Sequence, residues 1–173
     1  KKNQDKSMPA RIVYIPHKFV HIDPVDNMIY DGYFQSERYF DRKETLKLFE
    51  SADFIKEQIK DFNLKGTSIH VRRGDYISKY INTYEILDIG YYEEAMGLIP
   101  HKFINEIPQQ RLFIIYSDDK DWVNKNFKVT KDRKNDPCDY IELYSMANCE
   151  NNIIANSSFS WWGAYLNQNP DKK

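Results

Sequence analysis

TSIHVRRGDY, residues 67 to 76, is the stretch that sets the fold of this chain. Its first half, Thr67–Val71, reads as a short β-branched strand, and Gly74 then lets the backbone leave the sheet and open a loop. In an open α/β sheet, ligands bind outside the carboxyl ends of the strands. The planar fork of arginine suits phosphate and keeps its charge at any working pH. Arg72 and Arg73 therefore predict a ligand that carries phosphate.

A second anion site is predicted near the end of the chain. The apolar run NNIIA, residues 151–155, is followed by NSSFSWWGAYLN, residues 156–167. Small hydroxyl residues stand where this strand gives way to a helix, and the start of a helix carries unpaired N–H groups and a positive dipole end. We expect Ser157, Ser158 and the amide of Phe159 to face the same ligand as the arginines.

Strands and helices alternate between these two segments. The sequence predicts strands at Thr67–Val71, 112–116, 127–129 and 152–155, and helices near 91–99, 119–126, 139–148 and 159–167. Alternating elements with short links indicate right-handed crossovers and a parallel sheet covered on both faces. The predicted fold class is therefore α/β, with a Rossmann-like parallel sheet.

The sequence before this sheet has a different character. Residues 1–29 contain three prolines and no sustained period, so we predict irregular structure there, followed by a strand at 30–34. From Glu44 apolar residues recur every three or four positions, which is typical of a buried helical face. These residues are Leu46, Phe49, Ala52, Ile55, Ile59 and Phe62. One helix is predicted up to Lys65 and Gly66, and it divides a region 1–65 from a sheet domain 66–173.

Composition limits the class of protein. The 173 residues are 41% hydrophobic and 15% aromatic, enough to fill a core, and the net charge of −1 gives no reason to expect nucleic acid as a partner. Cys138 and Cys149 lie across a predicted helix, about 16 Å apart at its usual rise, which is too far for a disulfide. Free thiols fit a reducing compartment. No apolar stretch approaches the roughly 20 residues that cross a bilayer.

Three motifs in order carry a family resemblance. With HVRRGDY (70–76), YSDDKDW (116–122) and NSSFSWWGAYLN (156–167), the chain resembles the α-1,2-fucosyltransferases, glycosyltransferase family 11. It is more distantly similar to the α-1,6-fucosyltransferases, which share the H-x-R-R element. The resemblance implies a GT-B type fold, in which 66–173 is the GDP-fucose-binding half and 1–65 the end of the acceptor-side region. The family's glycine-rich G-x-G-N-Q segment is absent, so we expect a chain truncated at both ends.

The resemblance also implies a function. The enzyme would be an inverting glycosyltransferase that moves fucose from GDP-fucose to a galactose hydroxyl of an acceptor glycan, in α-1,2 linkage and without a cofactor. We expect a cytoplasmic bacterial protein, peripheral on the membrane at full length, or a Golgi lumen protein if the source is eukaryotic. The rival interpretation is a non-catalytic or truncated module that only binds a GDP-sugar.

Particular roles follow for residues at the first strand end. The period of a strand places Arg72 and Arg73 on opposite faces. By resemblance, Arg72 binds the β-phosphate of GDP-fucose, and Arg73 holds the loop through Asp75. His70 shares the face of Arg72, and we expect it to anchor backbone beside the nucleotide. Asp75 is one candidate for the catalytic base. Glu37 is a second candidate, and the N-terminal part of the enzyme that this sequence lacks is a third possible source of the base.

Two aspartates follow the strand at 112–116. A carboxylate there can accept both N–H groups of guanine, and the resemblance favours Asp118 for this role. Asp119 is expected to cap the next helix. Asp119, Lys120 and Asp121 also read as D-x-D, a metal-binding signature of another class of sugar-nucleotide transferase, but such a short pattern has poor specificity. Because arginine already supplies positive charge for a departing diphosphate, we predict no metal.

Two further motifs keep open alternatives. Tyr33, Gln35, Ser36 and Glu37 resemble a family segment near the cleft, or form an ordinary polar loop. Trp161 and Trp162 are expected in the core rather than as a platform for a sugar.

Overall fold

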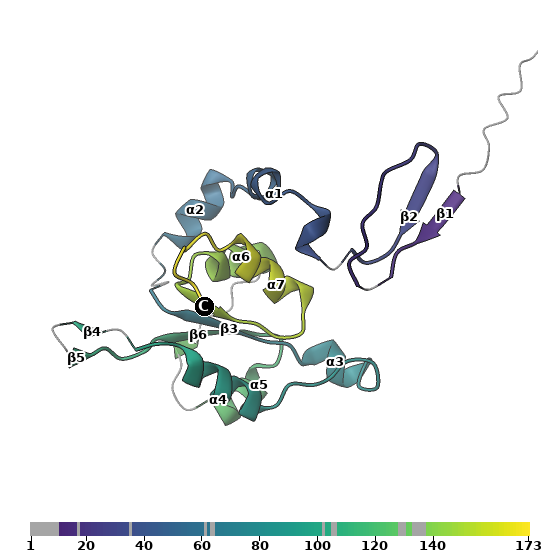
Figure 1. Ribbon diagram of the computed structural model, residues 1–173. Coiled ribbons are helices and arrows are strands. Elements are labelled where there is room, and N and C mark those ends of the chain that lie inside the picture. The colour runs from purple at the N-terminus through teal and green to yellow at the C-terminus, as the bar shows by residue number, and fades with distance from the viewer. Residues whose placement is uncertain are drawn as a thin grey trace, which may run out of the picture. The chain divides into compact units, whose positions relative to one another are not determined.

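The structure is a computed structural model, and it describes residues 11–16, 18–34, 36–60, 62, 65–101, 103–104, 107–127, 131–132 and 138–173. The chain forms two compact units, Lys1–Glu50 and Ser51–Lys173, called here the N-terminal unit and the sheet unit. Each unit is described by itself (Figure 1).

Four parallel strands form the centre of the sheet unit. They are β3 (Thr67–Val71), β6 (Phe113–Ser117), β7 (Lys131–Asp132) and β8 (Asn151–Ile153), and they lie side by side in the order β7-β6-β3-β8. From β3 the chain builds outward through β6 and β7, and then returns to place β8 on the other side of β3. The strand order therefore reverses between β3 and β8. A reversal of this kind opens a crevice at the carboxyl ends of the two strands.

The predicted strands agree with the structure in part. The strand at Thr67–Val71 is confirmed, and β6 and β8 overlap the strands predicted at 112–116 and 152–155. The strand predicted at 127–129 is wrong at Phe127, a buried residue that ends the preceding helix, and 128–130 lie outside the described residues. No sequence pattern predicts the short antiparallel pair β4 (Phe103–Ile104) and β5 (Ile107–Pro108).

Helices cover both faces of the sheet (Figure 1). On one face lie α4 (Ile89–Leu98) and α5 (Lys120–Asn126), and on the other lie α6 (Asp139–Ala147) and α7 (Ser158–Leu166). All four correspond to predicted helices. A fifth helix, α3 (Gly74–Ser78), continues directly from the carboxyl end of β3, where the sequence predicts only a loop.

Alternate residues of the strands fill two separate cores. Ile69 and Val71 pack with Tyr92 of α4 and Val123 of α5 on one face of the sheet. On the opposite face, two residues of β6 pack with α6 and α7, in a cluster formed by Ile114, Tyr116, Met146 and Cys149 with Phe159 beside them. Every residue of β3 is buried, as expected for a central strand with helices above and below.

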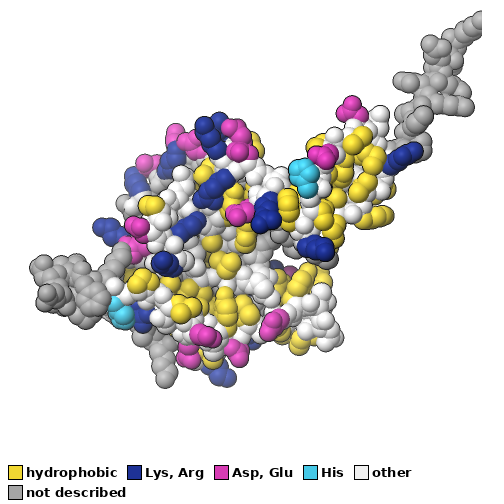
Figure 2. Space-filling model, in the orientation of Figure 1, with side chains coloured by type: hydrophobic (Ala, Val, Ile, Leu, Met, Phe, Trp, Pro, Cys, Tyr) yellow, Lys and Arg dark blue, Asp and Glu magenta, His cyan; other side chains and the backbone are white. Residues whose placement is uncertain are grey.

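The N-terminal unit contains a second, smaller sheet. Strand β1 (Arg11–Tyr14) pairs in parallel with β2 (Met28–Asp31), and η1 (Glu37–Tyr39) and α1 (Arg42–Leu48) follow. The expectation of irregular structure through residue 29 is therefore wrong at β1. The strand predicted at 30–34 ends earlier, because Phe34 has a φ of 49°, a left-handed conformation that a strand does not accommodate. Hydrophobic side chains gather over β1 and β2 (Figure 2).

The single helix predicted from residue 44 is in fact two helices. Helix α1 ends at Leu48, and α2 (Asp53–Ile59) begins after Ala52, whose ψ of 152° is extended. The buried face of α2, Ile55 and Ile59, packs on Ile141 of α6. The boundary between the two compact units falls at Glu50/Ser51, because α2 packs with the sheet unit. Acidic and basic side chains are interspersed over α2, where Lys56 pairs with Asp53 (Figure 2).

Candidate functional site

The candidate site lies at the carboxyl ends of β3, β6 and β8, around the reversal of strand order. Three segments meet there: the β3–α3 connection, the β6–α5 connection and the β8–α7 connection. These are the segments that the sequence singles out. The structure thus brings together motifs that are separated by about forty residues each in the chain.

Arg72 is held between two carboxylates. Its Nη2 lies 2.7 Å from Oδ1 of Asp75, and its Nη1 lies 3.0 Å from Oδ2 of Asp118. The first contact is an ion pair without hydrogen-bond geometry, since Oδ1 of Asp75 is buried and has no hydrogen-bond partner. The guanidinium also lies over the ring of Tyr76, 5.5 Å from its centroid. About a third of the Arg72 side chain remains exposed, just past the carboxyl end of β3.

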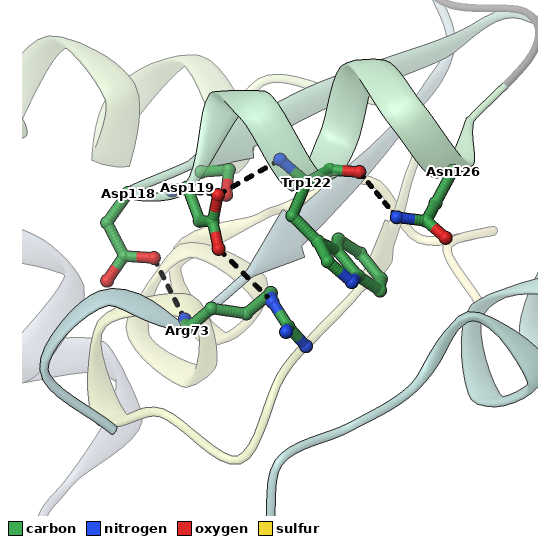
Figure 3. Close-up of polar contacts among 6 residues, drawn as sticks. Arg73, Asp118, Asp119, Trp122 and Asn126 are labelled. Carbon is green, nitrogen blue, oxygen red and sulfur yellow. Dashed lines mark hydrogen bonds and ion pairs between the residues drawn. The ribbon is translucent and has the colours of Figure 1, made fainter. Parts of the chain in front are cut away.

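Arg73 has a different set of partners (Figure 3). Its Nε lies 3.3 Å from Oδ2 of Asp119, and its guanidinium stacks over the ring of Trp122, 4.2 Å from the centroid. The Arg73 side chain is only 14% exposed, less than half the exposure of Arg72. The two arginines therefore point in different directions, as the strand period predicts. The expected contact of Arg73 with Asp75 is wrong, because Asp75 pairs with Arg72 instead.

The two aspartates after β6 tie this network to α5. Oδ1 of Asp119 accepts a hydrogen bond from the amide of Trp122, which confirms the predicted helix cap. Oδ1 of Asp118 accepts a hydrogen bond of 2.9 Å from the amide of Arg73 (Figure 3). A Cβ atom at Gly74 would lie 2.9 Å from Oδ2 of Asp118, so any other residue at this position would displace the Asp118 carboxylate. Asp118 thus braces the arginine loop, and its proposed contact with guanine stays a prediction.

His70 lies beneath Arg72 on the α7 side of the sheet. It is 6% exposed, and its ring lies 5.4 Å from the ring of Phe159. Burial lowers the pKa of His70 to about 4, with a smaller opposing effect of Asp118 and a further lowering by Arg72. The imidazole is therefore neutral at pH 7. Its Nδ1 is buried without a hydrogen-bond partner in the described structure, so the structure shows no backbone anchored at that atom.

The start of α7 has no side-chain cap. Ser157 is the N-cap residue, with extended backbone, and its side chain makes no capping hydrogen bond. Ser158 is exposed, and Ser157 and Phe159 are half-buried. The next serine, Ser160, is buried and donates its hydroxyl back to the carbonyl of Ala155. The first-turn amides of α7 thus have no side-chain cap from Ser157, which leaves them suited to an anion.

Sequence reasoning missed the residues that fasten the β8–α7 connection. The hydroxyl of Tyr76 in α3 donates to the carbonyl of Asn156 over 2.9 Å, and the hydroxyl of Tyr91 in α4 donates to the carbonyl of Ile154 over 2.6 Å. The side-chain amide of Asn156 donates to the carbonyl of Glu85. Tyr76 belongs to the HVRRGDY motif, and its position there is the one sequence feature that could have indicated this contact.

The remaining predicted residues lie elsewhere. Ser36 and Glu37 belong to the N-terminal unit, where the hydroxyl of Ser36 accepts a hydrogen bond from the amide of Arg38, and Gln35 lies outside the described residues. Trp161 and Trp162 are half-buried on α7. Cys138 and Cys149 are free thiols, as predicted.

Two features are absent from the part of the chain that the structure describes. The described residues contain no group of three or more His, Cys, Asp or Glu side chains that could hold a metal ion. None of the helices they form is long and apolar enough to span a bilayer.

Comparison with known proteins places the chain in a family. Residues 15–171 match the family model described as Glycosyl transferase family 11. The chain is 36% identical to the O-antigen biosynthesis glycosyltransferase WbnK of Escherichia coli over 75% of this chain and 43% of that protein. It is 32% identical to an α-1,2-colitosyltransferase of E. coli, over 78% and 50%. It is 25% identical to galactoside α-(1,2)-fucosyltransferase 2 of Rattus norvegicus, over 92% and 47%.

The chain spans about half the length of the curated relatives it matches. A search of solved structures finds no significant match. The family model covers nearly the whole chain, including all three strand-end segments of the site. The chain belongs to glycosyl transferase family 11.

Proposed function

We propose that this chain forms the donor-binding part of an inverting α-1,2-fucosyltransferase. The donor would be GDP-fucose, and the acceptor a galactose hydroxyl of a glycan. The observation that carries the proposal is Arg72, partly exposed at the reversal of strand order and opposite the uncapped start of α7. Both features suit a diphosphate.

The sheet supports a Rossmann-like half of a GT-B type enzyme. If β3, β6, β7 and β8 are numbered 1 to 4 along the chain, their order in the sheet is 3-2-1-4. Dinucleotide-binding sheets have the order 3-2-1-4-5-6, so this order matches their first four positions. In such sheets the ligand lies across the carboxyl ends at the reversal, where Arg72 and Ser157 are found. In this proposal the sheet unit binds the donor.

Arg72 has the capacity to bind the leaving group while it keeps its present partners. A guanidinium has five N–H donors, and the contacts to Asp75 and Asp118 engage one nitrogen each. The two carboxylates fix the direction of the guanidinium before the ligand arrives. An arginine oriented in advance stabilises charge that grows on the leaving phosphate at the transition state.

Direct displacement at C1 of fucose also needs a base for the acceptor proton. Asp75 and Glu37 are the two carboxylates proposed for this role. Asp75 lies beside Arg72 at the crevice, whereas Glu37 belongs to the N-terminal unit. Replacement of each by its amide tests the assignment, since loss of the base should lower kcat by about a hundredfold or more. Glu37→Gln should leave GDP affinity nearly unchanged, whereas Asp75→Asn also removes the ion pair that orients Arg72 and should weaken GDP binding as well.

Nucleotide choice tests the donor assignment. We propose that Asp118 accepts hydrogen bonds from guanine, so GDP should raise the melting temperature and ADP should not. At ~100 times its Kd, a ligand adds roughly 2.7 kcal/mol to stability. We further propose that no metal takes part, so EDTA should leave the GDP shift unchanged. Equal shifts from GDP and ADP would show that the base is not read by Asp118.

A second donor is favoured by one relative, the α-1,2-colitosyltransferase with 32% identity. Colitose lacks the 3-hydroxyl of fucose, so a GDP-colitose donor would differ from GDP-fucose only at the sugar. Initial rates with GDP-fucose and GDP-colitose, on the same galactose-terminated acceptor, separate them. If neither sugar is transferred while GDP still binds, the chain belongs to a non-catalytic GDP-sugar-binding module.

The partners follow from the same proposal. They are GDP-fucose and a galactose-containing acceptor glycan, with no nucleic acid. The relative of O-antigen biosynthesis supports a bacterial surface polysaccharide as the acceptor, and with it a cytoplasmic enzyme peripheral to the membrane.

A further inference from the structure

Exposed aromatic side chains follow the site arginine along the chain. The segment from α3 to residue 84 carries Tyr76, Tyr80, Ile81 and Tyr84, called here the tyrosine platform. Tyr80 is 44% exposed, Ile81 59% and Tyr84 45%. Such a concentration of exposed apolar surface within a few residues marks a place for a ligand more often than a chance arrangement.

The platform is ordered before any ligand binds. Tyr84 stacks on Tyr76, with ring centroids 4.5 Å apart and planes at 21°, and the rings of Tyr80 and Tyr84 form a T-shaped pair with centroids 5.8 Å apart. Backbone hydrogen bonds from the amide of Tyr80 to the carbonyl of Asp75, and from the amide of Tyr84 to the carbonyl of Tyr80, close the turn. Little conformational entropy would therefore be lost when a ligand settles on these rings.

The platform is continuous with the diphosphate site. The guanidinium of Arg72 lies over one ring of the platform, Tyr76, and Tyr84 stacks on that same ring. The hydroxyl of Tyr76 is in turn bonded to the carbonyl of Asn156, one residue before the cap of α7. A molecule on Tyr80 and Tyr84 would consequently lie next to the place where the donor's phosphates are proposed to bind.

We propose that the tyrosine platform binds the galactose-terminated acceptor glycan, and that Tyr80 and Tyr84 stack on its sugar rings. The inference rests on the proposed transferase function. A pyranose has one face of C–H groups, which is attracted to the electron-rich face of an aromatic ring, and hydroxyls at its rim. Tyrosine offers both an apolar ring and a hydroxyl, which match the apolar face and the polar rim of a sugar. The neighbouring arginine places the acceptor beside the reacting donor.

The test uses the full-length enzyme with GDP-fucose as donor and two β-galactosides, lactose and lacto-N-biose, as acceptors. Tyr84→Leu and Tyr80→Leu remove a ring but keep apolar bulk, and Tyr84→Phe keeps the ring. Tyr140→Leu is the matched control, because Tyr140 on α6 is 42% exposed and lies outside the platform. The measured quantities are the KM for each acceptor, the KM for GDP-fucose and the calorimetric Kd for GDP.

We expect Tyr84→Leu to raise the acceptor KM by about tenfold, the usual worth of one aromatic contact. Tyr80→Leu should have a smaller effect in the same direction. Tyr84→Phe should retain most of the acceptor affinity because it keeps the ring, Tyr140→Leu should behave like the wild type, and GDP affinity should be constant throughout. This combination would support the platform as the acceptor site.

Two results overturn the inference while the proposed function stands. In the first, both leucine variants transfer fucose with unchanged acceptor KM. In the second, GDP affinity falls in parallel with acceptor affinity, which would mean that the platform only positions Arg72. A wild type that binds GDP but transfers fucose to neither galactoside contradicts the proposed function itself.

Discussion

At the scale of single residues, the two adjacent arginines have different roles: we expect Arg72 to bind the ligand and Arg73 to stabilise the fold. Arg72 is partly exposed between Asp75 and Asp118, whereas Arg73 is nearly covered by Asp119 and Trp122. If Arg72 makes a charge-assisted contact with diphosphate, Arg72→Ala should weaken GDP binding roughly a hundredfold, which corresponds to about 3 kcal/mol. Calorimetry gives the affinity, and a melting curve should show only a modest loss of stability, from the ion pairs with Asp75 and Asp118.

The same reasoning predicts the opposite balance for Arg73→Ala. Loss of its ion pair and its stacking contact should destabilise the free protein by roughly 2 kcal/mol and lower Tm by about 4 to 8 °C. Binding should weaken only as a consequence. If Arg73→Ala abolished GDP binding at unchanged Tm while Arg72→Ala unfolded the protein, the two roles would be reversed.

His70 predicts a dependence of stability on pH. Its pKa is lowered from 6.5 to about 4 in the folded chain, so protons bind the unfolded chain more readily than the folded one. The stabilising effect of a neutral His70 is complete above pH 6.5 and is lost as pH falls towards 4, a change on the order of 3 kcal/mol. Denaturant unfolding at several pH values measures it. His70→Phe, whose ring cannot titrate, should flatten the curve between pH 6.5 and 4, and an unchanged slope would contradict the assignment.

Sequence alone predicts which residues gather at this site, but not how they pair. The strand ends place Arg72, Asp118 and Ser157 together because parallel strands end at one edge of a sheet. The contact of Asp75 with Arg72 depends on the helical turn of α3, and no pattern in the sequence predicts that helix. The stacking of Arg73 on Trp122 depends on the orientation of α5 against the sheet, which is set by packing far along the chain.

At the scale of elements, two helices pack closely at one glycine. A Cβ atom on Gly163 of α7 would lie 3.1 Å from Cβ of Met146 on α6. Gly163→Ala should therefore lower the free energy of unfolding by about 1 to 3 kcal/mol, because the helices must separate to admit the methyl group. Gly97 of α4 is the matched control, since its added Cβ meets nothing within 4 Å.

At Gly97 the same substitution should raise stability by about 0.5 to 1 kcal/mol, because alanine is the better helix former. Urea unfolding of both variants gives the two values. A Gly163→Ala protein as stable as Gly97→Ala would mean that α6 and α7 are not packed as closely as described.

Elements were predictable where short-range signals decide them. The β-branched run fixes β3, and the Asp119 cap fixes the start of α5. The break between α1 and α2 could not be predicted, because the three-to-four-residue spacing of apolar residues continues through Ala52. The backbone of Ala52 is nevertheless extended. Strand β1 has only four residues, and its partner β2 comes later in the chain, so no local pattern reveals the pairing.

At the scale of the whole molecule, the residues proposed to contact the donor all belong to the sheet unit. A substitution that destabilises the N-terminal unit should then leave the affinity for the donor unchanged. Tyr39 suits the test, because its ring packs against Phe19 and Phe34 and its hydroxyl accepts the amide of Val20, all within the N-terminal unit. Tyr39→Ala should lower stability and keep the calorimetric Kd for GDP within about twofold. A large loss of GDP affinity would show that the N-terminal unit completes the donor site.

The hydrogen bonds that two tyrosines make to the β8–α7 connection affect how that connection can move. The hydroxyls of Tyr76 and Tyr91 bond to carbonyls of the β8–α7 connection, and the side chain of Asn156 bonds back to Glu85. The β8–α7 connection can move away from the sheet only when these bonds break. We therefore expect it to open together with the β3–α3 loop that carries Arg72. Amide hydrogens of both segments should then exchange with deuterium at one common rate, and bound GDP should slow the two together. Arrival and departure of nucleotide would thus occur as a single cooperative step and not as two independent loop movements.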